Sequence, residues 1–144
     1  TPSPTPASTP APTPALNPAP TPAPACDTTF NQVESSRSYS SVYMNSEPGT
    51  GYAQSMLDSA QAWSAGWVSA GQYMILDMGE VALVGGVITQ SRADRPWEYV
   101  KTFTVQYSSD GSTWEDITGT FPCSSSADKL VQKFPSRPLH LHLH

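Results

Sequence analysis

The stretch from Gln72 to Trp114 decides the fold, and it reads QYMILDMGEVALVGGVITQSRADRPWEYVKTFTVQYSSDGSTW. Three apolar runs of strand length lie in it, at Tyr73–Leu76, Val81–Thr89 and Tyr99–Tyr107. The last run alternates apolar and polar residues with a period of two, which is typical of a strand buried on one face. The pair Asp110-Gly111 predicts a tight hairpin turn, after which the chain returns as a strand from Trp114.

Outward from this stretch, the chain predicts more short strands and no long helix. We expect strands at Ala53–Asp58 and Leu130–Phe134, and an extended segment that then turns at Ser35–Tyr43. Glycines inside a strand favour a bulge or a close approach of another backbone, and we expect one or the other at Gly85-Gly86. The further residues expected to be buried are Phe30, Val33, Trp63, Trp67 and Trp114. Many short strands with turn signals between them indicate an all-β sandwich.

The chain divides into two parts of different composition. Residues 1–25 hold ten of the fifteen prolines and no charged residue, so we interpret them as an extended, semi-rigid Pro/Thr/Ala-rich linker. The alternatives are a disordered tail without a spacing role, an O-glycosylated segment and part of a hydroxyproline-rich wall protein. Residues 26–144 are expected to form one small domain.

Composition argues against several classes of protein. Seven basic residues stand against twelve acidic ones, without a Lys/Arg cluster, so no nucleic-acid partner is expected. No apolar run approaches the ~20 residues of a membrane span. Two cysteines, Cys26 and Cys123, beside a Pro/Thr linker fit an extracellular protein, secreted or on the cell surface. The chain has neither a signal peptide nor an initial Met, which predicts a mature or excerpted piece.

Several motifs occur in the order that one family shows. They are Ser-Ser-Val-Tyr at 40–43, Met-Leu-Asp at 56–58, Ala-Trp-Ser at 62–64, Leu-Asp-Met-Gly at 76–79, Val-Ile-Thr-Gln-Ser-Arg at 87–92, Glu-Tyr-Val-Lys-Thr-Phe-Thr-Val-Gln-Tyr-Ser at 98–108 and Asp-Gly-x-x-Trp at 110–114. Together they resemble the discoidin domain, also called the coagulation factor V/VIII type C domain, which is related to carbohydrate-binding module family 32. The resemblance covers roughly Thr29 to Phe134. It has one departure, because Ser91 stands where the family usually has Gly.

The resemblance implies an antiparallel, jelly-roll-like β-sandwich whose ligand surface is formed by loops at the end opposite the termini. In this family a Cys at the start of the domain commonly bonds one at its end. Cys26 matches the first and nothing matches the second, which implies a C-terminally truncated domain without its last strand or strands. Counting strands from Tyr99 places Cys123 near the ligand end, and the resemblance implies that Cys26 lies at the opposite end, with the termini. We therefore expect no Cys26–Cys123 bond, since a disulfide needs Cα atoms within about 7 Å.

The loops Asn45–Tyr52 and Ser91–Glu98 match the binding loops of the family. The candidate ligand-binding residues in them are Asn45, Glu47, Tyr52, Arg92, Asp94, Arg95, Trp97 and Glu98. Arg and Asp offer directional hydrogen bonds to sugar hydroxyls, and an aromatic ring offers a face for stacking. Arg92 and Glu98 match positions that take part in recognition in collagen-binding relatives. The alternative is that these two residues form an ion pair that only braces the loop.

The sequence contains few residues that indicate a metal site or a catalytic site. The resemblance makes Asp58 a residue that orders a loop or binds a cation, and sugar-binding relatives often hold a structural Ca²⁺, although no compact Ca²⁺ loop is visible. The residues His140, His142 and His144 would share one face of a strand and could hold a metal. An exposed strand face, or the end of a truncated gene, is the favoured interpretation of these histidines. No nucleophile elbow, phosphate loop or Ser–His–Asp order is present, so no enzyme is predicted.

The sequence thus predicts an extracellular, galactose-binding-like module that recognises carbohydrate on a cell surface or matrix. Its partner would be a glycan or glycoprotein, and its linker would tether it to other domains. The second hypothesis is a cell-adhesion module that binds a protein ligand. A phospholipid-binding module comes third, because the loop tips are acidic and only Met44, Tyr52 and Trp97 could insert into a bilayer.

Overall fold

Strands make up nearly all of the regular structure in the described part of the chain, which confirms the all-β prediction. The computed structural model describes Thr1, Cys26 and residues 28–143, with residues 136–143 as backbone only. The elements are the 3-10 helices η1 (Glu34–Ser36) and η2 (Tyr43–Asn45) and the strands β1 (Arg37–Tyr39), β2 (Met74–Leu76), β3 (Ala82–Thr89), β4 (Thr102–Ser108), β5 (Glu115–Pro122) and β6 (Leu130–Leu143). Among these residues, no helix is long and apolar enough to cross a membrane.

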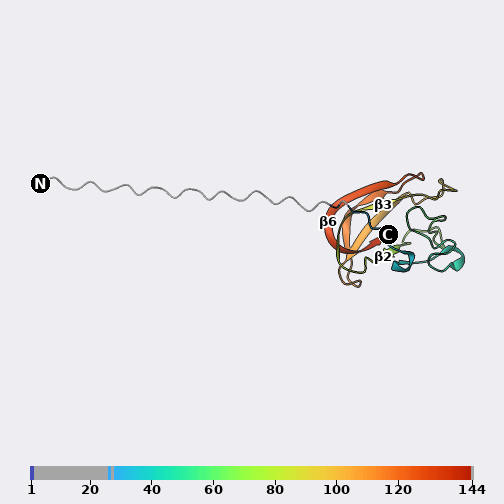
Figure 1. Cartoon of the computed structure of the whole chain (residues 1–144), viewed down its shortest axis with the longest axis horizontal. Helices are drawn as coiled ribbons and strands as arrows, with labels where there is room; N and C mark the ends of the chain where they lie inside the picture. Colours follow the sequence, from blue (N-terminus) through green and yellow to red (C-terminus); the bar gives the residue numbers. More distant parts are fainter. Residues whose placement is uncertain (2–25, 27, 144) are drawn as a thin grey trace.

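The long strand β6 connects the two layers of the sandwich. Its residues 130–139 pair antiparallel with β3. Its residues 141–143 lie between β2 and β4, where Leu141 is opposite both Leu76 and Tyr107. The path β1-β2-β6-β4-β5 completes this sheet. Figure 1 shows β6 curving from the side of β3 towards β2, so that one strand takes part in both layers.

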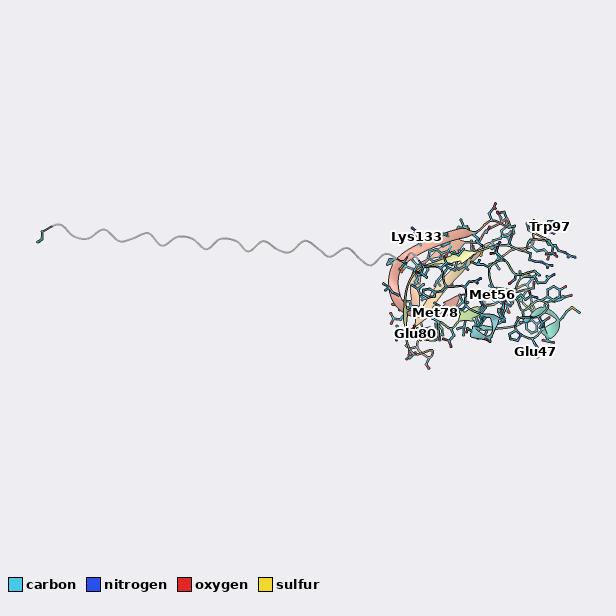
Figure 2. All side chains as sticks on the ribbon, viewed as in Figure 1. Glu47, Met56, Met78, Glu80, Trp97 and Lys133 are labelled. Carbon is cyan, nitrogen blue, oxygen red and sulfur yellow. The ribbon has the colours of Figure 1, made fainter. Side chains whose placement is uncertain are left out.

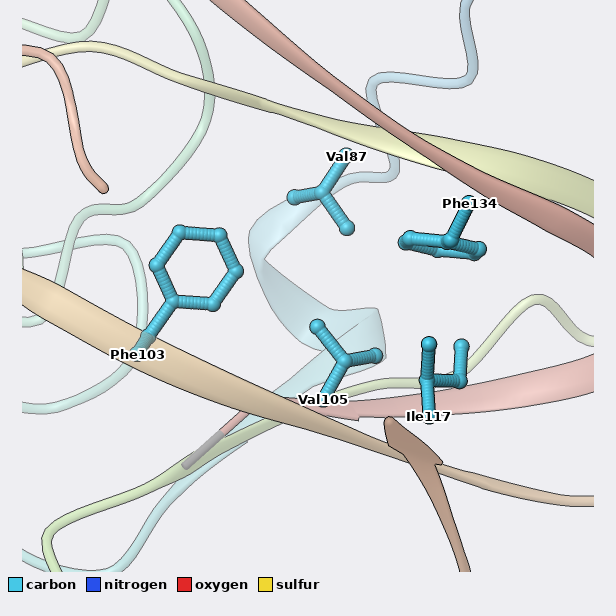
Figure 3. Close-up of a cluster of buried hydrophobic side chains, with 5 residues drawn as sticks. All are labelled: Val87, Phe103, Val105, Ile117 and Phe134. Atoms are coloured by element: carbon cyan, nitrogen blue, oxygen red, sulfur yellow. The ribbon is translucent and has the colours of Figure 1, made fainter. Parts of the chain in front are cut away.

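Five buried apolar side chains form the core between these layers (Figure 3), and they are Val87, Phe103, Val105, Ile117 and Phe134. They come from β3, β4, β5 and β6. In β4, the buried Phe103 and Val105 flank the exposed Thr104, as the period of two predicts. The ring of Phe121 lies 5.7 Å from that of Phe103 and 6.0 Å from that of Phe134. Each such buried side chain stabilises the fold by about 1.5–3 kcal/mol.

The β3–β6 ladder shifts register between Val84 and Gly86, so an irregularity lies at the predicted position, but its extra residues are in β6. A Cβ atom on Gly86 would lie 2.4 Å from the carbonyl oxygen of Gln132, so the close approach of β6 requires glycine here. Val84 and Val87, on either side of the shift, both contact the core.

The strand predicted at Ala53–Asp58 is wrong. No strand forms in this described segment. The backbone N–H groups of Ser55 and Met56 donate instead to the carboxylate of Glu34, at 2.7 and 2.9 Å. A side chain therefore takes the place that a neighbouring strand would have.

The hairpin predicted at Asp110-Gly111 is confirmed, because β4 pairs antiparallel with β5, but its turn is not tight: β4 ends at Ser108 and β5 begins only at Glu115. Asp110 Oδ1 accepts the N–H groups of Ser112 and Thr113, at 2.7 Å each, and these bonds hold the pKa of Asp110 well below its usual range. One carboxylate thus organises a wider turn than a two-residue hairpin.

Three of the residues expected to be buried are exposed. Phe30, Val33 and Trp67 have exposed fractions of 58%, 56% and 69%. Phe30 and Val33 lie outside any strand, in a segment that polar side chains attach to the domain. Trp63 is partly buried as expected: its ring stacks on Tyr39 at 5.4 Å between centroids, and its indole donates to the carbonyl oxygen of Ser41.

The two cysteines lie near opposite ends of β3, as the strand count predicts. The Cys26 thiol lies 3.8 Å from the carbonyl oxygen of Leu83, near the start of β3. At the other end, the N–H next to Cys123, that of Ser124, donates to Thr89 Oγ1 at 3.1 Å. No disulfide joins the two cysteines in the described structure. Burial raises the pKa of the Cys123 thiol to about 11.

Candidate functional site

The two loops predicted to bind ligand lie at one end of the domain. Figure 2 shows Glu47 and Trp97 at this end, and Lys133 at the opposite end. The loops also touch each other, because Arg92 Cζ lies 6.0 Å from the centroid of the Tyr52 ring. This distance is at the limit for attraction between a cation and an aromatic face. The sequence therefore brings residues 40 positions apart into one candidate site.

Arg92 is the centre of the second loop. Only 8% of it is exposed, although it is charged. Its Nε and Nη2 donate to the two carboxylate oxygens of Asp94, at 3.0 and 2.9 Å. Its Nη1 donates to Glu98 Oε2 at 3.0 Å. The ion pair that would brace the loop is thus present, with Asp94 as an additional bidentate partner.

These contacts set the electrostatics of the loop. The hydrogen bonds from Arg92 hold the pKa of Asp94 below its usual value, and the Asp94 carboxylate raises the pKa of Arg92. Arg95 Nη1 adds a bond of 3.3 Å to Glu98 Oε1. Two cations and two anions therefore form one fixed network in which Arg92 is buried and the others face solvent.

Local backbone bonds explain why the loop takes this shape. The N–H of Glu98 donates to the carbonyl oxygen of Arg95 at 3.0 Å, which closes a turn around Pro96. The N–H of Ser91 donates to the carbonyl oxygen of Ser126 at 3.1 Å and ties the loop to the segment before β6. Ser91, at the position of the family's usual Gly, is buried in the loop base, and its Oγ has no hydrogen-bond partner within the described residues.

Most of the predicted site residues are open to solvent. Trp97 is 72% exposed, and the side chain of Arg95 is 56% exposed. Asp94 and Glu98 are about half exposed, and Asn45 and Glu47 are exposed on the first loop. Tyr52 is half-buried, since its ring packs edge-on against Tyr43 with centroids 5.1 Å apart. The site thus offers charged groups and a free indole face around a buried arginine.

A neighbouring apolar surface was not predicted in full. It consists of Tyr43, Met44, Trp67 and Val68, which are 50%, 73%, 69% and 108% exposed. The two segments are joined by bonds from the Tyr43 N–H to the carbonyl oxygen of Ser64, at 2.8 Å, and from the Gly66 N–H to Ser41 Oγ, at 2.9 Å. The sequence sign of this surface was that Trp67 stands among small residues, without the alternation that is typical of a strand.

Asp58 occupies a loop-ordering position. Its carboxylate accepts bonds from Lys129 Nζ at 2.6 Å and from Gln90 Nε2 at 3.1 Å, and its N–H donates to Gln90 Oε1 at 2.9 Å. The lysine lowers the pKa of Asp58. Within the described residues, no three His, Cys, Asp or Glu side chains form a group that could hold a metal ion. His144 lies outside the described residues, and β6 is described only as backbone at His140 and His142.

Comparison with known proteins gives one match. A model of the F5/8 type C domain matches residues 33–139, a range that includes both candidate loops and the five core residues. No curated protein matches the chain.

Proposed function

We propose that this chain, which belongs to the F5/8 type C (discoidin) domain family, recognises carbohydrate through the loops Asn45–Tyr52 and Ser91–Glu98. Domains of this family are ligand-binding modules for carbohydrate, phospholipid or protein, and they are generally non-catalytic. They typically occur in extracellular or cell-surface proteins, and we assign this chain to the same environment. Residues 26–144 would be the binding domain, and residues 1–25 the linker that tethers it.

One observation carries the proposal: Trp97 is exposed and directly precedes Glu98 in the loop that the Arg92–Asp94–Glu98 network holds. A sugar ring has an apolar C–H face and a polar rim of hydroxyls. Trp97 supplies a flat surface for the first. The half-exposed carboxylates and Arg95 supply charge-assisted hydrogen bonds to the second.

We also assign different roles to Arg92 and Arg95, the two arginines of this network. Arg92 has all three guanidinium nitrogens bonded within the protein, so its role is to hold Asp94 and Glu98 in place. Arg95 makes one long bond of 3.3 Å and has an exposed side chain, so it is the arginine that contacts ligand.

A glycan array with the whole chain tests this proposal. We expect saturable binding to a subset of glycans, and we expect Arg95→Ala to remove most of that signal while the thermal midpoint stays within about 2 °C, as for a surface substitution. An array without any glycan-selective signal from the wild-type chain would overturn the proposal.

Adhesion to a protein ligand is the second candidate, and the apolar surface of Tyr43, Met44, Trp67 and Val68 favours it. Exposed aromatic and Met side chains are enriched at protein interfaces. The measurement is a pull-down on immobilised collagen with wild type and Trp67→Ala. Retention that Trp67→Ala abolishes would place this candidate first.

Binding to phospholipid ranks third. The chain carries a net charge of −5, and Glu47, Asp94 and Glu98 lie at the candidate end, so an anionic bilayer would repel it. We expect no sedimentation with phosphatidylserine vesicles at physiological salt. Sedimentation that persists in high salt would reverse this ranking.

A further inference from the structure

Glu34 lies under the first candidate loop and is fully hydrogen-bonded. Its Oε1 accepts the N–H groups of Ser55 and Met56, at 2.7 and 2.9 Å. Its Oε2 accepts the phenol O–H of Tyr39 at 2.9 Å. Three donors thus converge on one carboxylate, which is an acceptor-only group whose bonds are strengthened by its charge.

Two further side chains, those of Asn31 and Arg37, hold residues 55–57, the segment that follows the first candidate loop. Asn31 Oδ1 accepts the N–H of Leu57 at 3.1 Å. Arg37, which is 8% exposed, donates from Nη1 to the carbonyl oxygen and the hydroxyl of Ser55, at 2.7 and 3.1 Å. Side chains from the start of the domain therefore satisfy the backbone of residues 55–57 in place of a strand.

The same glutamate also touches the loop near its tip. A Cβ atom on Gly49 would lie 3.4 Å from Glu34 Cβ, so the aliphatic part of Glu34 is in van der Waals contact range of the loop. The N–H of Gly49 donates to the carbonyl oxygen of Ala53 at 2.8 Å, and Ala53 is completely buried. Tyr52 lies between these fixed points, with its ring towards Arg92.

We propose that Glu34 is a positioning residue for the ligand site: it fixes the loop that presents Tyr52 to Arg92. This inference rests on the proposed function for its consequence on binding, but the loop-holding step can be measured without ligand. Loss of the carboxylate leaves the N–H groups of Ser55 and Met56 without an acceptor, so the loop exit opens locally while the strand core stays folded.

Amide hydrogen exchange in the whole chain measures this step. In Glu34→Ala, we expect exchange at Ser55 and Met56 to accelerate at least ~10-fold. Glu34→Asp retracts the carboxylate by one methylene and should accelerate it less, which provides a milder variant if alanine prevents folding. Glu34→Gln retains one carbonyl oxygen for the two N–H groups and should restore most of the protection.

The matched control is Glu115→Ala, which removes a carboxylate that accepts a tyrosine O–H, that of Tyr107 at 2.7 Å, outside the candidate loops. It should leave exchange at Ser55 and Met56 unchanged. Unaltered exchange in both Glu34→Ala and Glu34→Asp would overturn the inference.

Binding is then compared on the glycan array. We expect Glu34→Ala to lose ~10-fold in affinity and Glu34→Gln to recover it, with Glu115→Ala equal to wild type. Faster exchange with undiminished array binding would overturn the positioning role. If the wild-type chain gives no array signal, the proposed function fails, whereas accelerated exchange would still support Glu34 as the residue that holds the loop.

Discussion

The strand core and the loop end of this domain are stabilised by different forces. The core contains only apolar side chains in its buried cluster, contributed by β3, β4, β5 and β6. Outside this cluster two arginines are buried instead, Arg37 in β1 and Arg92 in the Ser91–Glu98 loop, each 8% exposed and each hydrogen-bonded within the protein. Apolar burial adds up over area without regard to direction, whereas hydrogen bonds depend on angle and distance.

Because of this difference, we expect some substitutions to affect the stability of the whole domain and others to affect one loop only. A core substitution changes the packing of several strands at once and should lower the free energy of unfolding of the whole domain. A substitution at the loop end removes directional contacts of one loop, so its main effect should be on local opening and on binding.

Phe103→Ala should give the largest loss of stability. The side chain is 7% exposed and packs against Phe121, so its truncation should lower the free energy of unfolding by about 3–5 kcal/mol. Urea denaturation measures this loss. The control is Thr104→Ala, one residue along the same strand and exposed, which should cost less than about 0.5 kcal/mol. Equal losses of stability in Phe103→Ala and Thr104→Ala would contradict the distinction between core and surface positions in β4.

Arg92→Met should have an intermediate effect on stability. It removes the cation from a network whose carboxylates remain about half exposed, so we expect a loss of about 1–2 kcal/mol in urea. The control is Lys129→Met, which removes an exposed ion pair with Asp58 and should cost at most about 1 kcal/mol. A loss for Arg92→Met as large as that for Phe103→Ala would mean that the loop end contributes to global stability as the core does.

The ion pair between Arg92 and Asp94 should also make the stability of the fold depend on pH. Because Arg92 holds the pKa of Asp94 below its usual value, the pair stabilises the fold at pH above the ordinary Asp range and loses this contribution as the pH falls through the lowered pKa. Acid titration of wild type and Arg92→Met, followed by thermal midpoint, should therefore converge at low pH. If the thermal midpoints of wild type and Arg92→Met stay equally far apart down to pH 2, the Arg92–Asp94 pair does not stabilise the fold as proposed.

Tyr39 should give the smallest effect, a change in how stability depends on alkaline pH. Desolvation raises its pKa from 10 to about 12, so its neutral form contributes fully below pH 10 and this contribution is lost as the pH rises through 12. Tyr39→Phe should be less stable at neutral pH, because it lacks the bonds to Glu34 and Ser55, but it should lose less stability between pH 10 and 12. An alkaline slope equal to that of wild type would contradict this.

The sequence pattern was sufficient for the core and only partly for the loop end. Alternation in Tyr99–Tyr107 predicted a strand buried on one face, because a strand's geometry places alternate residues on one side, and Phe103 and Val105 are buried accordingly, whereas Tyr99 is 42% exposed. The same approach failed at Ala53–Asp58, where the partner of the backbone is the side chain of Glu34, some twenty positions earlier. No local pattern encodes such a contact.

The candidate site shows the same limit. The motif resemblance located both loops, and the Arg92–Glu98 ion pair was one of its two interpretations. Neither the bidentate bond from Arg92 to Asp94 nor the burial of Arg92 could be predicted, because both depend on how the loop folds back on Tyr52. The exposure of Trp67 was missed for a related reason: a tryptophan was assumed to be in the core, and only the path of its loop places it outside.

Whether the Trp97 loop binds carbohydrate can be measured by comparing Trp97→Ala with Trp67→Ala on the glycan array. Both residues are exposed tryptophans, at 72% and 69%, outside the strand core, so the two substitutions are matched in chemistry and in their small effect on folding. We predict that Trp97→Ala loses at least ~10-fold in glycan affinity, as expected for a stacked aromatic ring, and that Trp67→Ala binds like wild type. Retained binding in Trp97→Ala together with lost binding in Trp67→Ala would contradict the claim and move the ligand surface to the apolar residues around Trp67.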